Sequence, residues 1–125
     1  MKYLLDTHIL IWWLDGNKRL PMHVRKILEE QESGLYVSAV TVWEISIKKS
    51  LQKLQIRNSF FDELKVGQFS ELPISFQHAQ AISDLPQIHH DPFDRMLIAQ
   101  AIVEKLTLIT TDQDILKYEV ATLKI

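Results

Sequence analysis

The apolar positions of the chain fall into short runs that alternate with segments of helical spacing. Residues 2–5, 35–37 and 107–110 are apolar or β-branched runs of strand length. Between such runs, apolar side chains recur every three or four residues, as Val24 and Leu28 do. Strands that alternate with helices predict a central, mainly parallel β-sheet covered by helices on both faces, which is a three-layer α/β/α fold.

Residues that favour helix starts indicate where the helices begin. Ser38 is a good N-cap, and no Pro or Gly follows it before about Leu51. Asp91 followed by Pro92 combines an N-cap with the residue preferred at the first helical position. The expected strands are residues 2–5, 35–37, 71–74, 107–110 and 120–123, and the expected helices are residues 7–14, 21 to before Gly34, 38–51, a segment from Ser59, 75–85 and 92–105.

Length and composition narrow the class of protein. The 125 residues suffice for one domain, residues 1–125, and for no second one. The chain has no cysteine, so disulfides and thiolate zinc sites are excluded. Asp6 interrupts the first apolar run before a signal-peptide core can form, and no run approaches the roughly 20 apolar residues of a membrane span. We therefore expect a cytoplasmic protein without membrane association.

Four acidic residues follow or flank the predicted strands at one end of the sheet. Asp6 directly follows the first strand, and Asp112 almost directly follows strand 107–110. Glu44 lies about two turns into the helix after the second strand, and Asp94 lies in the first turn of the helix from Pro92. Because ligands bind at the carboxyl ends of strands in such sheets, we expect these side chains to converge.

Four converging carboxylates imply a bound cation. They have no obvious lysine or arginine among them in the sequence and repel one another unless protons or cations neutralise them. Oxygen ligands suit Mg²⁺ or Mn²⁺, and such ions can activate water for attack on phosphorus, which predicts phosphodiester hydrolysis. The net charge of −2 becomes +2 when these four acids are set aside, since 14 Lys and Arg then face 12 acids. Charge alone therefore neither supports nor excludes a nucleic-acid substrate.

Each acid also has a purely structural explanation. Asp6 can cap the helix that begins at Thr7, and Asp112 can cap the turn over residues 113–118. Asp94 lies three residues after Asp91, where an acid can complete a reciprocal capping arrangement. Glu44 is harder to explain structurally, because a charge within an apolar stretch costs free energy unless it is paired, protonated or bound to a metal.

Four sequence segments contain or flank these acids: Leu4-Leu5-Asp6-Thr7-His8, Ser38-Ala39-Val40-Thr41-Val42-Trp43-Glu44-Ile45, His90-Asp91-Pro92-Phe93-Asp94-Arg95-Met96-Leu97-Ile98-Ala99-Gln100-Ala101 and Thr110-Thr111-Asp112. They resemble the PIN-domain family, especially the VapC-like toxin ribonucleases of toxin–antitoxin pairs. The third segment is the most specific, and together the four occur in family order over nearly the whole chain.

The resemblance implies an endoribonuclease in which Asp6, Glu44, Asp94 and Asp112 hold one or two Mg²⁺ or Mn²⁺ ions and cleave single-stranded or loop RNA. It places Thr7 and Thr111 in supporting roles near the metal. Asp114 competes with Asp112 for the last position, and Asp91 competes with Asp94 for the third. The resemblance also implies a homodimer and an antitoxin partner that covers the active site.

Other side chains allow two interpretations each. His8 can touch RNA or be a partly buried structural residue, and Arg95 can pair with phosphate or with a carboxylate. His89 and His90 suggest zinc, but adjacent histidines seldom reach one ion, which favours a loop that contacts substrate or solvent. A phosphate-contacting flank or a solvated helix face can be formed by Lys48, Lys49, Lys53 and Arg57. Core packing or a base-stacking surface are the alternatives for Trp12, Trp13 and Trp43. Core packing or a groove for a partner helix are the alternatives for Phe60, Phe61 and Leu64.

Two other functions fit the same fold class. A receiver-like signalling domain needs paired acids after the first strand and a lysine near the end of the sheet, whereas here Asp6 is alone and Lys105, Lys117 and Lys124 are poorly placed. A PIN fold that only binds RNA or protein would have little reason to keep four mutually repelling acids.

Overall fold

The computed structural model describes residues 1–30 and 34–124. Its strands and helices alternate along the chain as the apolar pattern predicts. In chain order the described elements are β1 (Tyr3–Leu5), α1 (Thr7–Asp15), α2 (Met22–Glu30), β2 (Leu35–Ser38), α3 (Ala39–Ser50), α4 (Phe60–Val66), β3 (Ser70–Leu72), α5 (Phe76–Ala81), the 3₁₀ helix η2 (Ile82–Asp84), α6 (Pro92–Glu104), β4 (Thr107–Thr110), the 3₁₀ helix η3 (Ile115–Lys117) and β5 (Thr122–Lys124).

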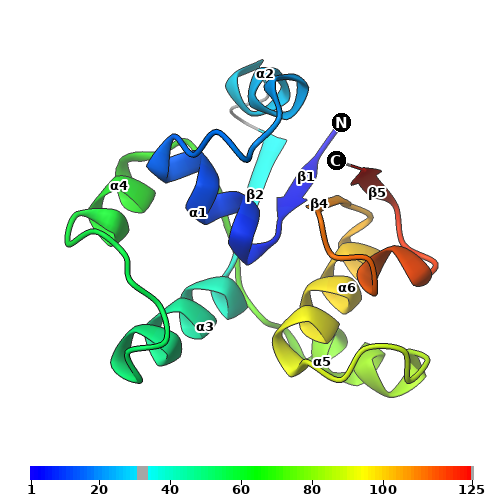
Figure 1. Ribbon diagram of the computed structural model, residues 1–125. Helices are drawn as coiled ribbons and strands as arrows, with labels where there is room; N and C mark the ends of the chain where they lie inside the picture. Colours follow the sequence, from blue (N-terminus) through cyan, green and yellow to red (C-terminus); the bar gives the residue numbers. More distant parts are fainter. Residues whose placement is uncertain (31–33, 125) are drawn as a thin grey trace.

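Within these residues the strands form one sheet in the order β3-β2-β1-β4-β5 (Figure 1). Each neighbouring pair is parallel, so the described sheet is wholly parallel, where the sequence predicted a mainly parallel one. β1 is central, with Leu4 in register with Tyr36 of β2 and Leu108 of β4. All carboxyl ends therefore lie at one edge of the sheet.

Successive residues of β1 point to opposite faces of the sheet, and a separate hydrophobic core covers each face. Tyr3 and Leu5 pack in the core that contains residues of α1 and α2 and Phe60 of α4. Leu4 packs in the second core, with Leu97 and Ile98 of α6. Figure 1 shows α1, α2 and α4 on one side of the strands and α5 and α6 on the other. This arrangement confirms the three-layer α/β/α prediction.

α3 connects the two helical layers near the carboxyl edge. It contacts both α1 and α6, and it contributes Ile45 to the first core and Val40 to the second. Ser38 caps this helix by accepting a hydrogen bond from the amide of Val40, as predicted. Because α3 touches both layers, its polar side chains can meet residues from either one.

Several boundaries differ from the sequence expectation. β3 ends at Leu72, because the next residue, Pro73, has no N–H to continue the ladder. The helix expected over residues 75–85 ends at Ala81 and continues as η2. Ser59 makes no side-chain capping bond to α4; its hydroxyl donates to Glu63 instead. Along the described residues, no helix is long and apolar enough to cross a membrane.

Candidate active site

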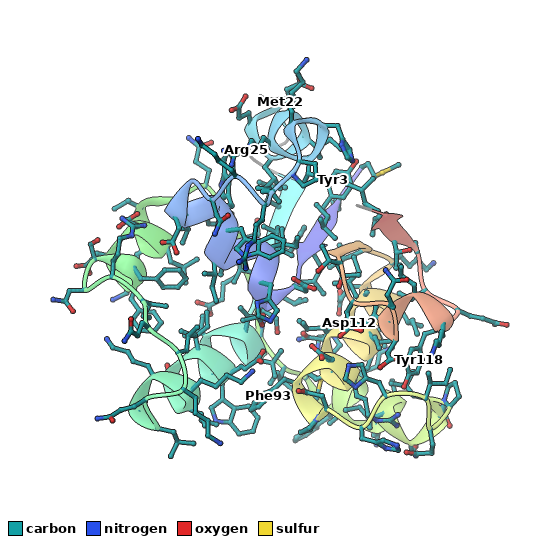
Figure 2. All side chains as sticks on the ribbon, in the orientation of Figure 1. Tyr3, Met22, Arg25, Phe93, Asp112 and Tyr118 are labelled. Atoms are coloured by element: carbon teal, nitrogen blue, oxygen red, sulfur yellow. The ribbon has the colours of Figure 1, made fainter. Side chains whose placement is uncertain are left out.

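The four predicted acids come from four different elements that meet at the carboxyl edge of the sheet. Asp6 follows β1, Asp112 follows β4, Glu44 lies on α3 and Asp94 lies in the first turn of α6. Asp112 lies between β4 and α6 in Figure 2, on the side where those elements approach the start of α1. Their charges act on one another, because Asp112 raises the pKa of Asp6 and of Asp94, and Glu44 also raises that of Asp94. Among the described residues, however, no three of these four acids bring ligand atoms within 4.8 Å of one another.

Asp6 is buried and held at both carboxylate oxygens. It is 5% exposed, its Oδ1 accepts a 3.0 Å hydrogen bond from the amide of Ile9, and its Oδ2 accepts one from the hydroxyl of Thr110. Burial raises the pKa of Asp6 above its ordinary value, although these two hydrogen bonds oppose that shift. The capping role weighed from the sequence is therefore confirmed.

Glu44 is also 5% exposed and has a donor on each oxygen. The Oγ1 of Thr7 donates a 2.7 Å hydrogen bond to Oε1, and the Nζ of Lys48 donates a 2.5 Å hydrogen bond to Oε2. The fold therefore places a lysine beside one of the acids, although no basic residue was obvious among them in the sequence. The spacing of four residues between Glu44 and Lys48, which places both on one helical face, was the signal for this pair.

Asp94 is the acid with the most perturbed ionisation. Burial and the nearby charge of Asp91 raise the pKa of Asp94 to about 7, and His89 partly offsets the shift. Asp91 caps α6 by accepting hydrogen bonds from the amides of Phe93 and Asp94. The reciprocal half of that cap is wrong, because the amide of Asp91 donates to Nδ1 of His89 and the carboxylate of Asp94 faces Nε2 of His89 at 3.0 Å.

His89 lies between two of the acids. Its Nε2 is 3.0 Å from Oδ2 of Asp94 and 3.1 Å from Oδ2 of Asp112. Burial acts to lower the pKa of His89, but the hydrogen bond to Asp112 and the charges of Asp94, Asp112 and Asp91 outweigh it and raise the pKa. His90 is exposed, so the two histidines do not act together on one ion. No sequence pattern indicates this position of His89, because only the folded loop brings its acidic neighbours close to it.

Asp112 and Asp114 both remain candidates for the last acidic position. Burial acts to raise the pKa of Asp112, but the hydrogen bonds from His89 and from the amides of Asp114 and Ile115 keep it below the ordinary value. The amide of Asp114 donates to Oδ1 of Asp112 at 2.8 Å, so Asp112 also fixes the turn before η3. Ligand atoms of His89, Asp112 and Asp114 lie within 4.8 Å of one another, a grouping that could hold a metal ion.

Thr110 was not among the predicted site residues. Its hydroxyl donates to Asp6, and its Oγ1 accepts a 3.0 Å hydrogen bond from the amide of Asp112. Thr111, which the family resemblance placed in a supporting role, is partly exposed and makes no side-chain hydrogen bond to any described residue. The one sequence feature that indicates this role is the position of Thr110 at the end of β4, immediately before the acidic turn.

Arg95 and His8 differ from their expected surroundings. Arg95 is 7% exposed and donates to the backbone carbonyls of Pro86 at 2.9 Å and Ile82 at 3.2 Å. The proposed carboxylate or phosphate contact of Arg95 is therefore replaced by a role in holding the loop that carries His89. His8 is exposed, and its ring centroid lies 6.3 Å from that of Trp12, so the partly buried reading was wrong.

An exposed aromatic pair lies beside the acids. Trp43 directly precedes Glu44 and is 57% exposed. Its ring meets that of Phe93, which directly precedes Asp94, edge to face with centroids 5.2 Å apart. Phe93 is labelled in Figure 2 near the start of α6, facing α3. Trp12 and Trp13 instead pack against the first core. Trp43 is thus the most exposed of the three tryptophans.

The other basic and apolar residues considered from the sequence lie in different surroundings. Arg57 pairs with Asp15 and Glu63, so it is not a free phosphate contact. Phe60 is fully buried in the core and takes no part in a groove. Phe61 and Leu64 do line a surface cavity of about 450 Å³, together with Val37, Ser38, Ala39, Val42, Lys65, Phe69 and Glu71.

The fold has three α/β/α layers around a wholly parallel sheet, and carboxylates lie at the carboxyl edge of that sheet. These two features define the class of fold and the kind of site. The PIN-domain family model matches residues 3–121, and the chain therefore belongs to the PIN-domain family. This membership excludes the receiver-like alternative. Among characterised proteins, the chain is 25% identical to ribonuclease VapC22 of Mycobacterium tuberculosis over 121 residues, covering 88% of this chain and 86% of that protein.

Several solved structures share the fold. A chain of VapBC2 from Rickettsia felis, in complex with a promoter DNA fragment, matches with a TM-score of 0.77 and 15% identity, covering 100% of this chain and 99% of that chain. A chain of DNA-bound VapBC from Salmonella typhimurium matches with a TM-score of 0.74 and 21% identity, covering 99% and 98%. FitAcB from Neisseria gonorrhoeae gives 0.73 and 20%, covering 97% and 96%.

Proposed function

We propose that this protein is a metal-dependent endoribonuclease that hydrolyses phosphodiester bonds of RNA. The observation that carries the proposal is the presence of Asp6, Glu44, Asp94 and Asp112 at one edge of the sheet, with the ammonium group of Lys48 and the imidazole ring of His89 beside them. Membership of the PIN-domain family and the similarity to a protein named ribonuclease support it.

The donor set fits Mg²⁺ or Mn²⁺. Carboxylate oxygens are the preferred ligands of both ions. Burial, and after it the negative charges of neighbouring acids, raises the pKa of Asp94 to about 7. Protein donors already lie against these oxygens: the ammonium group of Lys48 on Glu44, and Nε2 of His89 on Asp94 and Asp112. A bound divalent ion would lower the pKa of a water molecule, orient it towards phosphorus and stabilise the leaving oxygen.

The four carboxylates divide into a fixed pair and a more accessible pair. Asp6 and Glu44 are buried, and donors on all four of their oxygens fix the two side chains. The side chains of Asp94 and Asp112 are 21% and 33% exposed. We expect the fixed pair to determine where an ion binds and the accessible pair to face the substrate, because fixed ligands bind with less loss of conformational freedom.

Single-stranded RNA is the substrate we favour. A base can stack on an exposed aromatic side chain only when it is not paired within a duplex. Trp43 provides such a side chain next to Glu44. The phosphates on either side of a base stacked there would lie close to the acidic edge, where hydrolysis takes place.

Incubation of a fluorescently labelled single-stranded RNA with Mn²⁺, with and without chelator, tests the proposal. Asp6→Asn and Asp94→Asn are each expected to reduce cleavage at least about 100-fold with the fold intact, and asparagine still caps α1 in the first variant. Asp62→Asn, an exposed acid on α4, is the matched control and should cleave normally. The proposal would be overturned if both site variants still cleave, or if cleavage by the wild type resists chelator. If the wild type binds RNA without cleaving it, a catalytically silent PIN fold is favoured instead.

We also infer that the protein is the toxin of a toxin–antitoxin pair, acts in the cytoplasm and forms a homodimer. The similar structures include complexes named VapBC and FitAB. The cavity lined by Phe61 and Leu64 offers an apolar site for an antitoxin side chain. Co-expression with the protein encoded by the adjacent reading frame tests the pairing: a stable complex that loses cleavage supports it, and unchanged cleavage contradicts it. Light scattering after size-exclusion chromatography measures the oligomeric state.

A further inference from the structure

Lys48 brings a positive charge into the acidic site from within the protein. Its Nζ lies 2.5 Å from Oε2 of Glu44, and its side chain is 38% exposed. Asp91 and Asp94, which belong to the start of α6, are close enough for their charges to act on the ammonium group as well. The ammonium therefore interacts with carboxylates on two helices, unlike the usual pair of residues on one helix surface.

A divalent ion and this ammonium group would compete for the same oxygen. Oε2 is the oxygen of Glu44 that faces Lys48, while Oε1 already accepts the hydrogen bond from Thr7. A cation that binds Oε2 must displace the Nζ of Lys48 or share the oxygen with it, and two positive charges so close repel each other. Lys48 is flexible and more than one third exposed, so it can leave the oxygen for solvent without disturbing α3.

We propose that Lys48 is a built-in counter-cation that neutralises Glu44 in the metal-free protein and sets the affinity of the site for divalent ions. This inference rests on the proposed function, because it takes the acidic edge to be a metal site. It assigns Lys48 a role opposite to that of the acids: it stabilises the empty site and weakens ion binding. Lys48 then contributes to the stability of the metal-free protein and not to that of the metal-bound protein.

Titration calorimetry with Mn²⁺ alone, on the full chain without RNA, tests this role. Lys48→Met keeps most of the aliphatic stem and removes the charge, and it should bind Mn²⁺ roughly five- to tenfold more tightly than the wild type. Lys48→Arg restores a cation and should bind as the wild type does. Lys49→Met is the matched control: the Nζ of Lys49 lies over the ring of Phe61, 5.8 Å from its centroid, and this variant should leave the affinity unchanged.

Thermal unfolding supplies a second measurement. Lys48→Met should lower the melting temperature in chelator and recover it at saturating Mn²⁺, so the rise caused by Mn²⁺ is larger than in the wild type. A salt bridge with only a structural role would instead lower the melting temperature equally with and without Mn²⁺. Equal or weaker Mn²⁺ affinity of Lys48→Met would overturn the inference.

The two proposals fail in different ways. If the wild type binds no Mn²⁺ and yields no chelator-sensitive cleavage, the proposed function fails and the inference fails with it. If the wild type binds Mn²⁺ and cleaves RNA while Lys48→Met and Lys49→Met have the same affinity as the wild type, only the role of Lys48 is overturned.

Discussion

The hydroxyl group of Thr110 donates a hydrogen bond to Oδ2 of Asp6, although the two residues are 104 positions apart in the chain. The same Oγ1 accepts the amide N–H of Asp112 at 3.0 Å. Thr110 therefore links the acid that follows β1 to the acid that follows β4. This link depends on the parallel pairing of β1 with β4, which brings the ends of both strands together.

We predict that Thr110→Val lowers both stability and ion binding. Valine has the same shape but no donor, so the buried carboxylate of Asp6 loses a partner, at a cost of about 1–3 kcal/mol. Loss of that bond also raises the pKa of Asp6 further, so protons compete better with a metal ion, and we expect Mn²⁺ affinity to fall roughly tenfold.

The adjacent threonine provides the comparison for Thr110. Thr111→Val should change neither the free energy of unfolding nor the affinity for Mn²⁺ appreciably, because Thr111 makes no side-chain hydrogen bond among the described residues. Urea unfolding and calorimetric titration of both variants measure the difference. A larger effect at Thr111 than at Thr110 would favour the family-derived assignment over the geometry.

The raised pKa of Asp94 predicts that the stability of the metal-free protein depends on pH. Its pKa is about 7 in the folded protein and close to the ordinary value of 3.8 in the unfolded chain. The folded state therefore binds the proton more tightly, and the stabilisation present below pH 4 is lost as the pH rises through about 7. The wild type in chelator should thus be less stable at pH 8 than at pH 5.

Asp94→Asn removes this loss of stability at high pH. We expect the variant to exceed the wild type by about 1 kcal/mol at pH 8 and to match it near pH 5, since His89 and solvent offset part of the repulsion. Urea unfolding at both pH values, in the presence of chelator, measures the effect. A large loss of stability at pH 8 would instead show that Asp94 acts chiefly through the start of α6.

Arg95 supports the loop that carries His89, and we predict a strictly structural phenotype for its replacement. Arg95→Met leaves the carbonyls of Ile82 and Pro86 without their buried donor and should cost about 2–4 kcal/mol in the free energy of unfolding. His90→Ala, at an exposed position of the same loop, should stay within about 0.5 kcal/mol of the wild type. Urea unfolding of both variants checks the prediction, which unchanged stability of Arg95→Met would contradict.

The layers of the fold and the positions of the four acids could be predicted from the sequence, because both depend on short-range patterns. Apolar runs alternating with helical spacing identify strands of a parallel sheet, and Asp91 before Pro92 marks a helix start. An acid that directly follows a strand lies at the carboxyl edge whatever the details of packing. Asp6 and Asp112 are such residues.

The groups around the acids could not be predicted in the same way, because their roles depend on long-range packing. His89 reaches Asp94 and Asp112 only because the loop before α6 folds back, and Arg95 holds that loop through backbone carbonyls that no side-chain pattern reveals. The bond from Thr110 to Asp6 likewise depends on strand pairing. The pair of Glu44 and Lys48 is different, because a spacing of four residues on one helix already indicates a contact.

Trp43 provides a test of substrate binding that is separate from the metal chemistry. Its exposed ring beside Glu44 should stack on one base of a single-stranded RNA, so Trp43→Ala is expected to weaken binding of a short RNA to the Asp94→Asn background roughly tenfold. Fluorescence anisotropy measures that affinity, and calorimetry with Mn²⁺ on the single variant should give the wild-type value.

Two further variants separate stacking from general apolar contact at Trp43. Trp43→Phe retains an aromatic face and should keep most of the RNA affinity, whereas Leu51→Ala removes an equally exposed apolar side chain just after the same helix and should have no effect. If Trp43→Ala leaves RNA affinity unchanged but alters the mass measured by light scattering, Trp43 belongs to a contact between two copies of the chain. Such a result would remove the base-stacking role of Trp43 and leave the proposed metal site unaffected, because the carboxylates do not depend on this aromatic side chain.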